Sequence, residues 1–399
     1  MANSTRQPAA EVWITGIGLA SSLGEGLDAH WDALRSGRIN VDDKTFAPWM
    51  IHPLPPINFD SQIPRKGDQR QMETWQLIGV YTAGLALESA GIKGNAEILE
   101  RTHIVAAAGA GERDLVVDAR ILTERVQGDT SPTLLNERLM KGLRPTLGLT
   151  QLTNLLAGNI SIVHGVTGSS RTLMGEEIAG VDAARIALAR IAAGECDIAL
   201  IGGANNAARP DQLMLYEFGD FNLKDRFAPV WSRGPKGGFA LGSGGAFLVL
   251  ESRQHAEARG AKPYARLTRV VSDHVRRTDG AVAHALEKLW KELGADTVAT
   301  AIITGATGAE PATSEERAFL AAHKDIPVRS SSTSFGHTME MHFPLGLALA
   351  ALSLSKGELI PASDSSGVEL AMPAKPSRIV VIGAGHWRGE GMALVEAVD

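Results

Sequence analysis

Short apolar runs that end in glycine alternate with longer stretches of helical periodicity along the chain. Residues 12–16 (VWITG) and 301–305 (AIITG) share one pattern, which predicts buried strands that stop at a glycine. Residues 182–193 predict a helix closed by Gly194, and residues 197–201 predict the strand that follows it. Strands that alternate with helices are typical of α/β architecture.

The second half of the chain repeats this order. Residues 345–355 predict a helix that ends near Gly357, and residues 379–382 predict a strand. Each half then closes with a glycine-rich turn that leads into an apolar strand, at residues 242–250 and 389–395. We interpret the repeated order as an internal duplication, with chance similarity among α/β units as the alternative.

The duplication predicts two halves, residues 11–255 and residues 256–399. The charged segment 253–261 (RQHAEARGA) separates them. Two loop-rich insertions are expected in the first half, at residues 53–64 and 130–149, where turn-forming residues cluster.

Composition excludes several classes of protein. The 399 residues carry 39 basic and 45 acidic side chains, a net charge of −6, so no nucleic-acid partner is expected. The single cysteine excludes an intrachain disulfide framework and a cysteine-based zinc site. Neither an apolar secretory segment at the start nor a run of about 18 apolar residues is present, so we expect a cytoplasmic protein without membrane contact.

Three local motifs have simpler explanations than cofactor chemistry. Residues 16–21 (GIGLAS) faintly resemble a dinucleotide loop, but the third small position is serine and not glycine or alanine. His337 and His342 are five residues apart and cannot share one helix face, so no metal site is expected. Cys196 follows a predicted helix C-terminus, where the dipole disfavours a thiolate, and is interpreted as structural. No cofactor is expected.

Four longer segments resemble one known family, the β-ketoacyl-acyl-carrier-protein synthases. Residues 12–24 (VWITGIGLASSLG) are similar to the family's opening motif, and residues 238–251 (GFALGSGGAFLVLE) to its strand-turn-strand. Residues 255–265 resemble the helix end that follows, and residues 330–346 (SSSTSFGHTMEMHFPLG) resemble S-S-T-K-S-x-x-G-H-x-x-G-A-A-G. The resemblance implies a thiolase-like fold, in which two duplicated α/β halves form a layered αβαβα core.

The family's catalytic set is degenerate in this chain. By register from the resemblance, Glu177 stands where the nucleophilic cysteine is expected, and Ala306 where the first histidine is expected. The second histidine survives as His337. A carboxylate cannot hold the acyl chain stably, because the product is a reactive mixed anhydride, so no catalytic residues are expected for condensation.

The resemblance also implies a substrate-binding region. Ser332 takes the place of the family's lysine, with Thr333 beside it, and Trp387 lies near the gating phenylalanine of the loop at residues 385–391. Trp387 either narrows the former acyl tunnel or is an ordinary packed tryptophan. Glu177 is either a polar plug or partner contact, or a residue that merely begins a helix, and a structural role stays open for His337.

A subfamily with this defect is known, the chain-length factors of type II polyketide systems. The resemblance therefore implies a heterodimer with a catalytic ketosynthase subunit, formed through residues 168–174, and contact with an acyl carrier protein. Aryl polyene biosynthesis is the system suggested. Members usually carry glutamine where this chain has Glu177. An ionised Glu177 about 4 Å from an enolate would cost roughly 4 kcal/mol, which disfavours decarboxylation.

Two alternatives remain open at this point. The first is a stand-alone thioester enzyme, a malonyl-carrier-protein decarboxylase or altered acyltransferase, that uses Glu177 or Glu176 as a general base. The second is a scaffold that binds carrier protein and has no acyl pocket.

Overall fold

The central sheet of the computed structural model, which describes residues 10–128 and 131–398, contains two sets of strands. The first set is β1 (Val12–Ser21), β4 (His103–Ala107), β5 (Ser170–Leu173), β6 (Ile198–Asn205) and β8 (Gly244–Ser252). The second set is β9 (Ala265–Asp273), β10 (Thr300–Thr304), β11 (Val328–Ser330), β12 (Arg378–Ala384) and β13 (Glu390–Glu396). Both sets lie in one sheet, joined where β1 pairs antiparallel with β9.

Both sets repeat one topology. The order is β5-β4-β6-β8-β1 in the first set and β11-β10-β12-β13-β9 in the second. In the first set, β4 is parallel to β5 and β6, and β8 is antiparallel to β6 and β1. In the second set, β10 is parallel to β11 and β12, and β13 is antiparallel to β12 and β9. The predicted duplication into α/β halves is therefore confirmed, while the domain limits at residues 255 and 256 stay a prediction.

One predicted equivalence is wrong. Residues 12–16 lie in β1, the first strand of its half, whereas residues 301–305 begin in β10, the second strand of the other half. The true counterpart of β1 is β9, and that of β10 is β4. A buried apolar run that ends in glycine is common to several central strands, so the pattern alone cannot give a strand its place in the order.

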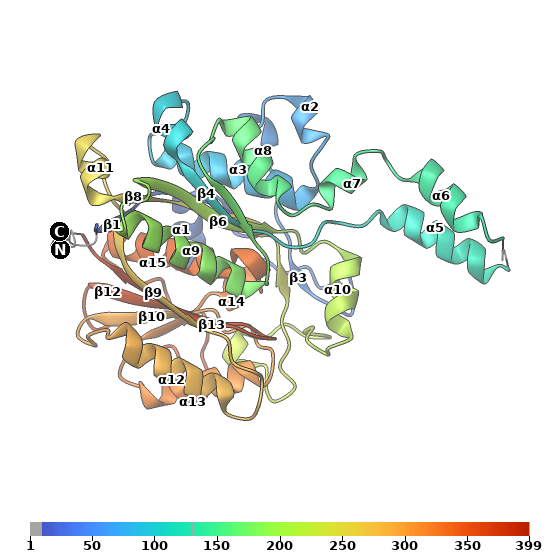
Figure 1. Ribbon diagram of the computed structural model, residues 1–399. Helices are drawn as coiled ribbons and strands as arrows, with labels where there is room; N and C mark the ends of the chain where they lie inside the picture. The colour runs from blue at the N-terminus through green and yellow to red at the C-terminus, as the bar shows by residue number, and fades with distance from the viewer. Residues whose placement is uncertain (1–9, 129–130, 399) are drawn as a thin grey trace, which may run out of the picture.

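Helices cover both faces of the sheet halves and also fill the layer between them (Figure 1). The middle layer is α9 (Glu177–Ala192) and α15 (His342–Lys356), which contact each other and strands of both halves. The outer layers are α3 (Thr74–Ser89) with α8 (Leu155–His164), and α12 (Ala281–Leu293) with α13 (Ala312–Ala322). This is the predicted αβαβα arrangement.

The burial of each helix follows from its sequence. The part of α15 from His342 to Leu354 is buried on all sides, as an apolar helix between two sheets must be, whereas α12 exposes a polar face. Gly180 lets α9 approach α15 closely, because a Cβ there would lie 2.6 Å from the Cδ of Pro344.

The expected loop-rich insertions differ from each other. Residues 53–64 contain only the 3₁₀ turn η1 (Phe59–Ser61). Residues 131–149 are largely helical, with α6 (Leu134–Gly142) and the start of α7 (Leu147–Thr150), so the expectation of a loop is wrong there; Thr130 lies outside the described residues. Together with α5 (Leu115–Val126), α6 forms an arm that projects from the body (Figure 1).

The remaining elements are short or peripheral. They are α1 (Leu27–Arg35), α2 (Lys66–Gln69), α4 (Ala96–Arg101), α10 (Pro210–Glu217), α11 (Arg253–Ala258), α14 (Ser332–Phe335), η2 (Val230–Ser232), η3 (Met339–Met341), β2 (Gly24–Glu25), β3 (Ile51–His52) and β7 (Leu241–Gly242). Across residues 10–128 and 131–398, no helix has both the length and the apolar character needed to cross a bilayer.

Candidate functional site

A sharp turn between β5 and α9, residues 175–177, carries the residue predicted to replace the nucleophile. We call this turn the elbow. Gly175 has φ 140°, and Glu176 has φ 58° and ψ −130°, a conformation that costs a non-glycine residue about 1–3 kcal/mol. The turn makes Glu177 the first residue of α9 and buries its side chain, which is only 2% exposed. Backbone strain of this kind is concentrated at functional sites, so a strained turn that directs one side chain inward makes this position a candidate site.

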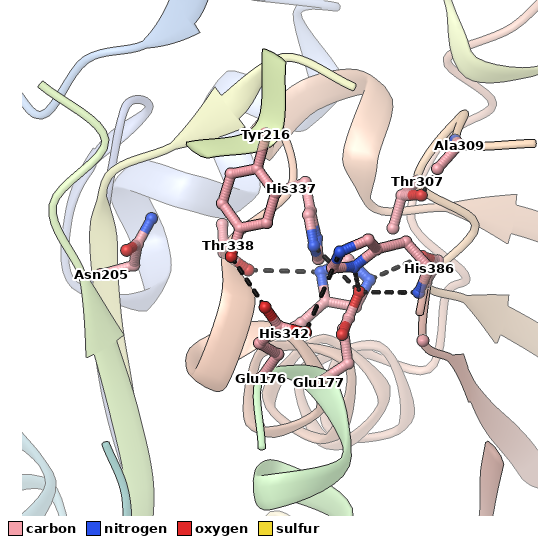
Figure 2. Close-up of polar contacts among 12 residues, drawn as sticks. Glu176, Glu177, Asn205, Tyr216, Thr307, Ala309, His337, Thr338, His342 and His386 are labelled. Atoms are coloured by element: carbon pink, nitrogen blue, oxygen red, sulfur yellow. Dashed lines mark hydrogen bonds and ion pairs between the residues drawn. The ribbon is translucent and has the colours of Figure 1, made fainter. Parts of the chain in front are cut away.

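The carboxylate of Glu177 receives contacts from two histidines (Figure 2). Its Oε1 accepts hydrogen bonds from Nδ1 of His386 at 2.8 Å and from the backbone N–H of His386 at 3.0 Å. Nε2 of His337 lies 3.0 Å from the same oxygen. His337 follows α14, and His386 lies in the loop from β12 to β13, so three separate elements meet at one oxygen atom.

The cluster is a buried ion pair. Burial raises the pKa of Glu177, but the imidazoles of His386 and His337 outweigh it and hold that pKa well below 4.5. Burial lowers the pKa of His386, but the charge and hydrogen bond of Glu177 outweigh it, so this pKa is raised above 6.5. A carboxylate paired with an imidazolium therefore lies at the position where the family resemblance predicts the nucleophilic cysteine.

His337 is held differently from His386. Its ring is fully buried, and among the described residues neither ring nitrogen makes a hydrogen bond. The 3.0 Å approach of Nε2 to Glu177 is close enough for charge interaction, but the N–H is not aligned on the oxygen. The imidazole packs among the rings of Phe239, His342 and His386, with centroids 4.7, 5.1 and 5.6 Å away.

A cavity of about 940 Å³ adjoins this cluster, and His386 lines it. Acidic groups also line it: Glu176, which accepts a 2.9 Å hydrogen bond from Tyr216, and Glu340. Burial, with the nearby charges of Glu176 and Glu177, raises the pKa of Glu340 to about 7. The end of the cavity next to the cluster is therefore polar and rich in carboxyl groups.

The structure brings only some of the predicted residues together. Glu177 and His337 are in contact, and Trp387 lines the cavity with its side chain 60% exposed. Ser332 and Thr333 are fully buried and are not among the residues that line this cavity; the Thr333 hydroxyl accepts a hydrogen bond from the backbone of η2.

Ala306 is buried in the loop after β10. The carbonyl of the preceding Gly305 accepts a hydrogen bond from Nε2 of His342 at 2.6 Å. Since His342 also packs against His337, it connects this loop to the Glu177 cluster (Figure 2).

Sequence reasoning missed His386 and Glu340. The gating-loop resemblance drew attention to Trp387, yet the preceding residue points inward, in a tight loop closed by a 2.8 Å hydrogen bond from Gly385 to Gly389. Glu340 takes the place of the first glycine after G-H in the family segment G-H-x-x-G-A-A-G. The presence of a carboxylate where the family segment has glycine was the feature of the sequence that could have indicated an altered cavity.

The fold and this elbow define the class of protein. A solved ishigamide ketosynthase/chain length factor superposes with a TM-score of 0.79 and 20% identity, over 98% of this chain and 100% of that chain. A type II PKS ketosynthase solved in complex with its acyl-carrier protein gives a TM-score of 0.73 and 18% identity, over the same shares of the two chains. The fold is that of the thiolase-like ketosynthases.

Sequence comparison assigns the family. A family model for the N-terminal domain of β-ketoacyl synthases matches residues 9–256, and the chain therefore belongs to the β-ketoacyl synthase family. It is 27% identical over 267 residues to the 3-oxoacyl-[acyl-carrier-protein] synthase 2 of Vibrio cholerae. That match covers 64% of this chain and 61% of the length of the relative.

Proposed function

We propose that this chain is a non-condensing ketosynthase subunit, of the chain-length-factor type, that acts beside a catalytic β-ketoacyl synthase in type II fatty-acid or polyketide-like elongation. The observation that carries the proposal is the Glu177–His386 ion pair. The elbow carries a carboxylate in place of a thiol, and the imidazoles of His386 and His337 both contact that carboxylate. Neither a thiol nor a free pair of histidines is therefore available at the elbow for condensation.

The one cysteine of the chain cannot substitute for the missing nucleophile. Cys196 follows α9, and Glu177 begins the same helix of 16 residues. At 1.5 Å per residue the helix is about 24 Å long, so the thiol lies at the far end from the cluster. Burial also raises the pKa of the Cys196 thiol, which reduces its nucleophilicity.

The edge of the sheet supports a partner subunit. Among the described strands, β5 ends the sheet order and pairs only with β4. The carbonyls of Ser169 and Leu173 accept hydrogen bonds from Ile104 of β4 and from Ala108 just after it. Ser170 and Thr172 have the opposite parity and therefore direct their backbone groups outward. An open strand edge is a template for pairing with another chain.

This edge gives a test of the partner role. Thr172→Pro removes one outward N–H and leaves the hydrogen bonds to β4, whereas Thr172→Val keeps the N–H and serves as the matched control. Co-expression with a β-ketoacyl synthase that carries the intact Cys-His-His set should give a one-to-one complex for wild type and Thr172→Val, and a weakened one for Thr172→Pro. A stable homodimer that ignores such a synthase would contradict the proposal.

The carrier-protein contact is part of the same proposal. The relative solved with its acyl-carrier protein supports it, as does the 940 Å³ cavity beside the elbow. Labelling with an acyl-carrier-protein crosslinking probe should capture this chain only when the catalytic subunit is present. Elongation systems of the aryl polyene type remain the proposed setting.

One observation favours a second candidate, a stand-alone thioester enzyme. Glu177 holds Nδ1 of His386 while the imidazole lines the cavity, an arrangement that can orient a histidine as general acid or base. Thioester hydrolysis and malonyl decarboxylation by the isolated chain should then fall at least about 100-fold in Glu177→Ala. If the wild-type chain is no faster than Glu177→Ala in these two reactions, this candidate is excluded.

A further inference from the structure

We propose that Glu177, His337 and His386 form a binding site for one divalent transition-metal cation of the zinc class. This goes beyond the subunit role proposed above and does not depend on it. Two imidazoles and one carboxylate are a ligand set that zinc uses in proteins.

The ligand atoms lie at suitable separations. One nitrogen from each histidine and one oxygen of Glu177 all lie within 4.8 Å of one another, and the two N···O distances are 2.8 and 3.0 Å. Zinc bonds of about 2.0–2.1 Å in a tetrahedral site put ligand atoms about 3.3 Å apart. The two N···O pairs would therefore have to separate by about 0.3–0.5 Å to admit an ion, and the two nitrogens already lie within 4.8 Å of each other.

The orientation of His337 is the independent observation. Nε2 lies 3.0 Å from Oε1 of Glu177, yet its N–H is not directed at that oxygen, and neither ring nitrogen makes a hydrogen bond among the described residues. A buried polar group without a hydrogen-bond partner is destabilising and therefore rare in a folded protein. Donors around a metal point at the ion and not at one another, so a cation would explain both the short distance and the missing alignment.

The surroundings provide an outer carboxylate and access. Oε2 of Glu176 lies 3.9 Å from Nε2 of His386, the nitrogen that is not directed at Glu177. Carboxylates placed behind a ligating imidazole orient it and strengthen the metal bond. Both residues line the 940 Å³ cavity, which offers an entry path and a direction from which water can complete the coordination.

Binding would displace a proton. Nδ1 of His386 now donates its hydrogen to Glu177, so this hydrogen must be displaced before the nitrogen can bind the ion. His342 and Tyr216 pack against the two histidines, and the charged groups of Glu176 and Arg277 also face His386; none of these residues is required as a ligand.

The test uses the full chain, treated with chelator and then dialysed against Zn²⁺ or Co²⁺ alone. We expect one equivalent of bound metal and, for Co²⁺, the intense visible absorption of a tetrahedral site. His337→Gln and Glu177→Gln should each lower affinity by at least about 100-fold. His284→Gln, which removes an exposed histidine of α12, is the matched control and should change affinity less than about twofold.

Loss of the metal site can be distinguished from failure of a variant to fold. Wild-type protein that binds no stoichiometric metal overturns the proposal without any variant. Metal bound equally by wild type and by both variants also overturns it, because the ion would then lie elsewhere. If one variant fails to fold, as circular dichroism would reveal, the other variant and the Co²⁺ spectrum of wild type decide the matter.

Discussion

The Glu177 carboxylate accepts two hydrogen bonds from His386 at the same oxygen, one from the ring Nδ1 at 2.8 Å and one from the backbone N–H at 3.0 Å. This contact joins the start of α9 to the loop between β12 and β13, which belong to different halves of the duplicated fold. It therefore connects the two halves at the elbow, where the family resemblance predicts the nucleophilic cysteine.

Glu177→Gln should destabilise the protein most in mildly acidic solution. Burial opposes ionisation of Glu177, but His386 and His337 outweigh it and depress its pKa below 4.5, so its stabilisation is present above that value and lost as pH falls through the depressed pKa. Glu177 outweighs burial and raises the pKa of His386, so that stabilisation is complete below 6.5 and lost as pH rises through the raised pKa.

The difference between wild type and Glu177→Gln should thus reach about 3–5 kcal/mol near about pH 6 and shrink in alkaline solution. Urea unfolding at a series of pH values measures it. Glu176→Gln is the matched control, since its side-chain oxygen can still accept the Tyr216 hydrogen bond. A difference that stays constant from acidic to alkaline pH would contradict the ion-pair assignment.

Double-mutant cycles should separate the two neighbouring glutamates. We expect a coupling energy of about 2–3 kcal/mol between Glu177 and His386, because both groups are buried and share a charged hydrogen bond. Coupling between Glu176 and His386 should stay below about 1 kcal/mol, since that pair is 3.9 Å apart and Glu176 is partly exposed. The four unfolding free energies of each cycle give the values, and a reversed order would refute this geometry.

Glu316→Gln should remove part of the pH dependence of stability. Burial raises the pKa of Glu316 to about 7 from 4.5, against a lowering hydrogen bond from Thr304. The folded protein therefore keeps a proton that the unfolded chain loses, and the contribution of Glu316 to stability falls by about 3 kcal/mol as pH rises from 4.5 to about 7.

The glutamine variant cannot titrate, so the difference between the unfolding free energies of wild type and variant should fall by about 3 kcal/mol over the same pH range. Glu340, whose pKa burial also raises to about 7, still titrates in this variant and keeps its own contribution to the pH dependence. Glu97→Gln, at an exposed position of α4, serves as the control and should reproduce the wild-type slope. Parallel curves for all three proteins would show that Glu316 is ionised when folded.

Two glycine-to-alanine substitutions should have opposite effects. At Gly180 the added methyl would lie 2.6 Å from Pro344 and 3.2 Å from Phe343 of α15, and the expected loss is about 1–3 kcal/mol. At Gly158 of α8 the nearest atom would be 3.6 Å away, so the usual helix-propensity gain of about 0.5–1 kcal/mol should appear. Thermal or urea unfolding distinguishes them; equal effects would disprove the close approach of the two middle helices.

Much of the fold was predictable because duplication leaves a repeated order of strands, helices and glycines. The helices at residues 182–193 and 345–355 were located, since an apolar helix with a glycine stop has one plain interpretation. The strand at 301–305 was matched to the wrong partner, because each central strand is apolar and strand order depends on contacts that are distant in sequence.

The site was predictable only where it followed a register. Counting from fixed motifs placed Glu177 at the elbow and His337 beside it, and the structure brings these two together. His386 could not be chosen over Trp387, because the conformation of a short glycine-rich loop decides which side chain points inward. The raised pKa of Glu340 depends on burial, which its position in the chain does not reveal.

The central claim is that Glu177 prevents this chain from holding the growing intermediate. Intact-mass spectrometry after incubation with acyl-carrier protein loaded with a short acyl chain tests it directly, in the presence and absence of the catalytic subunit. The account predicts an acyl adduct on the cysteine of that subunit and an unchanged mass for this chain in both samples. An acyl adduct on this chain, above all in the sample without the other subunit, would contradict it.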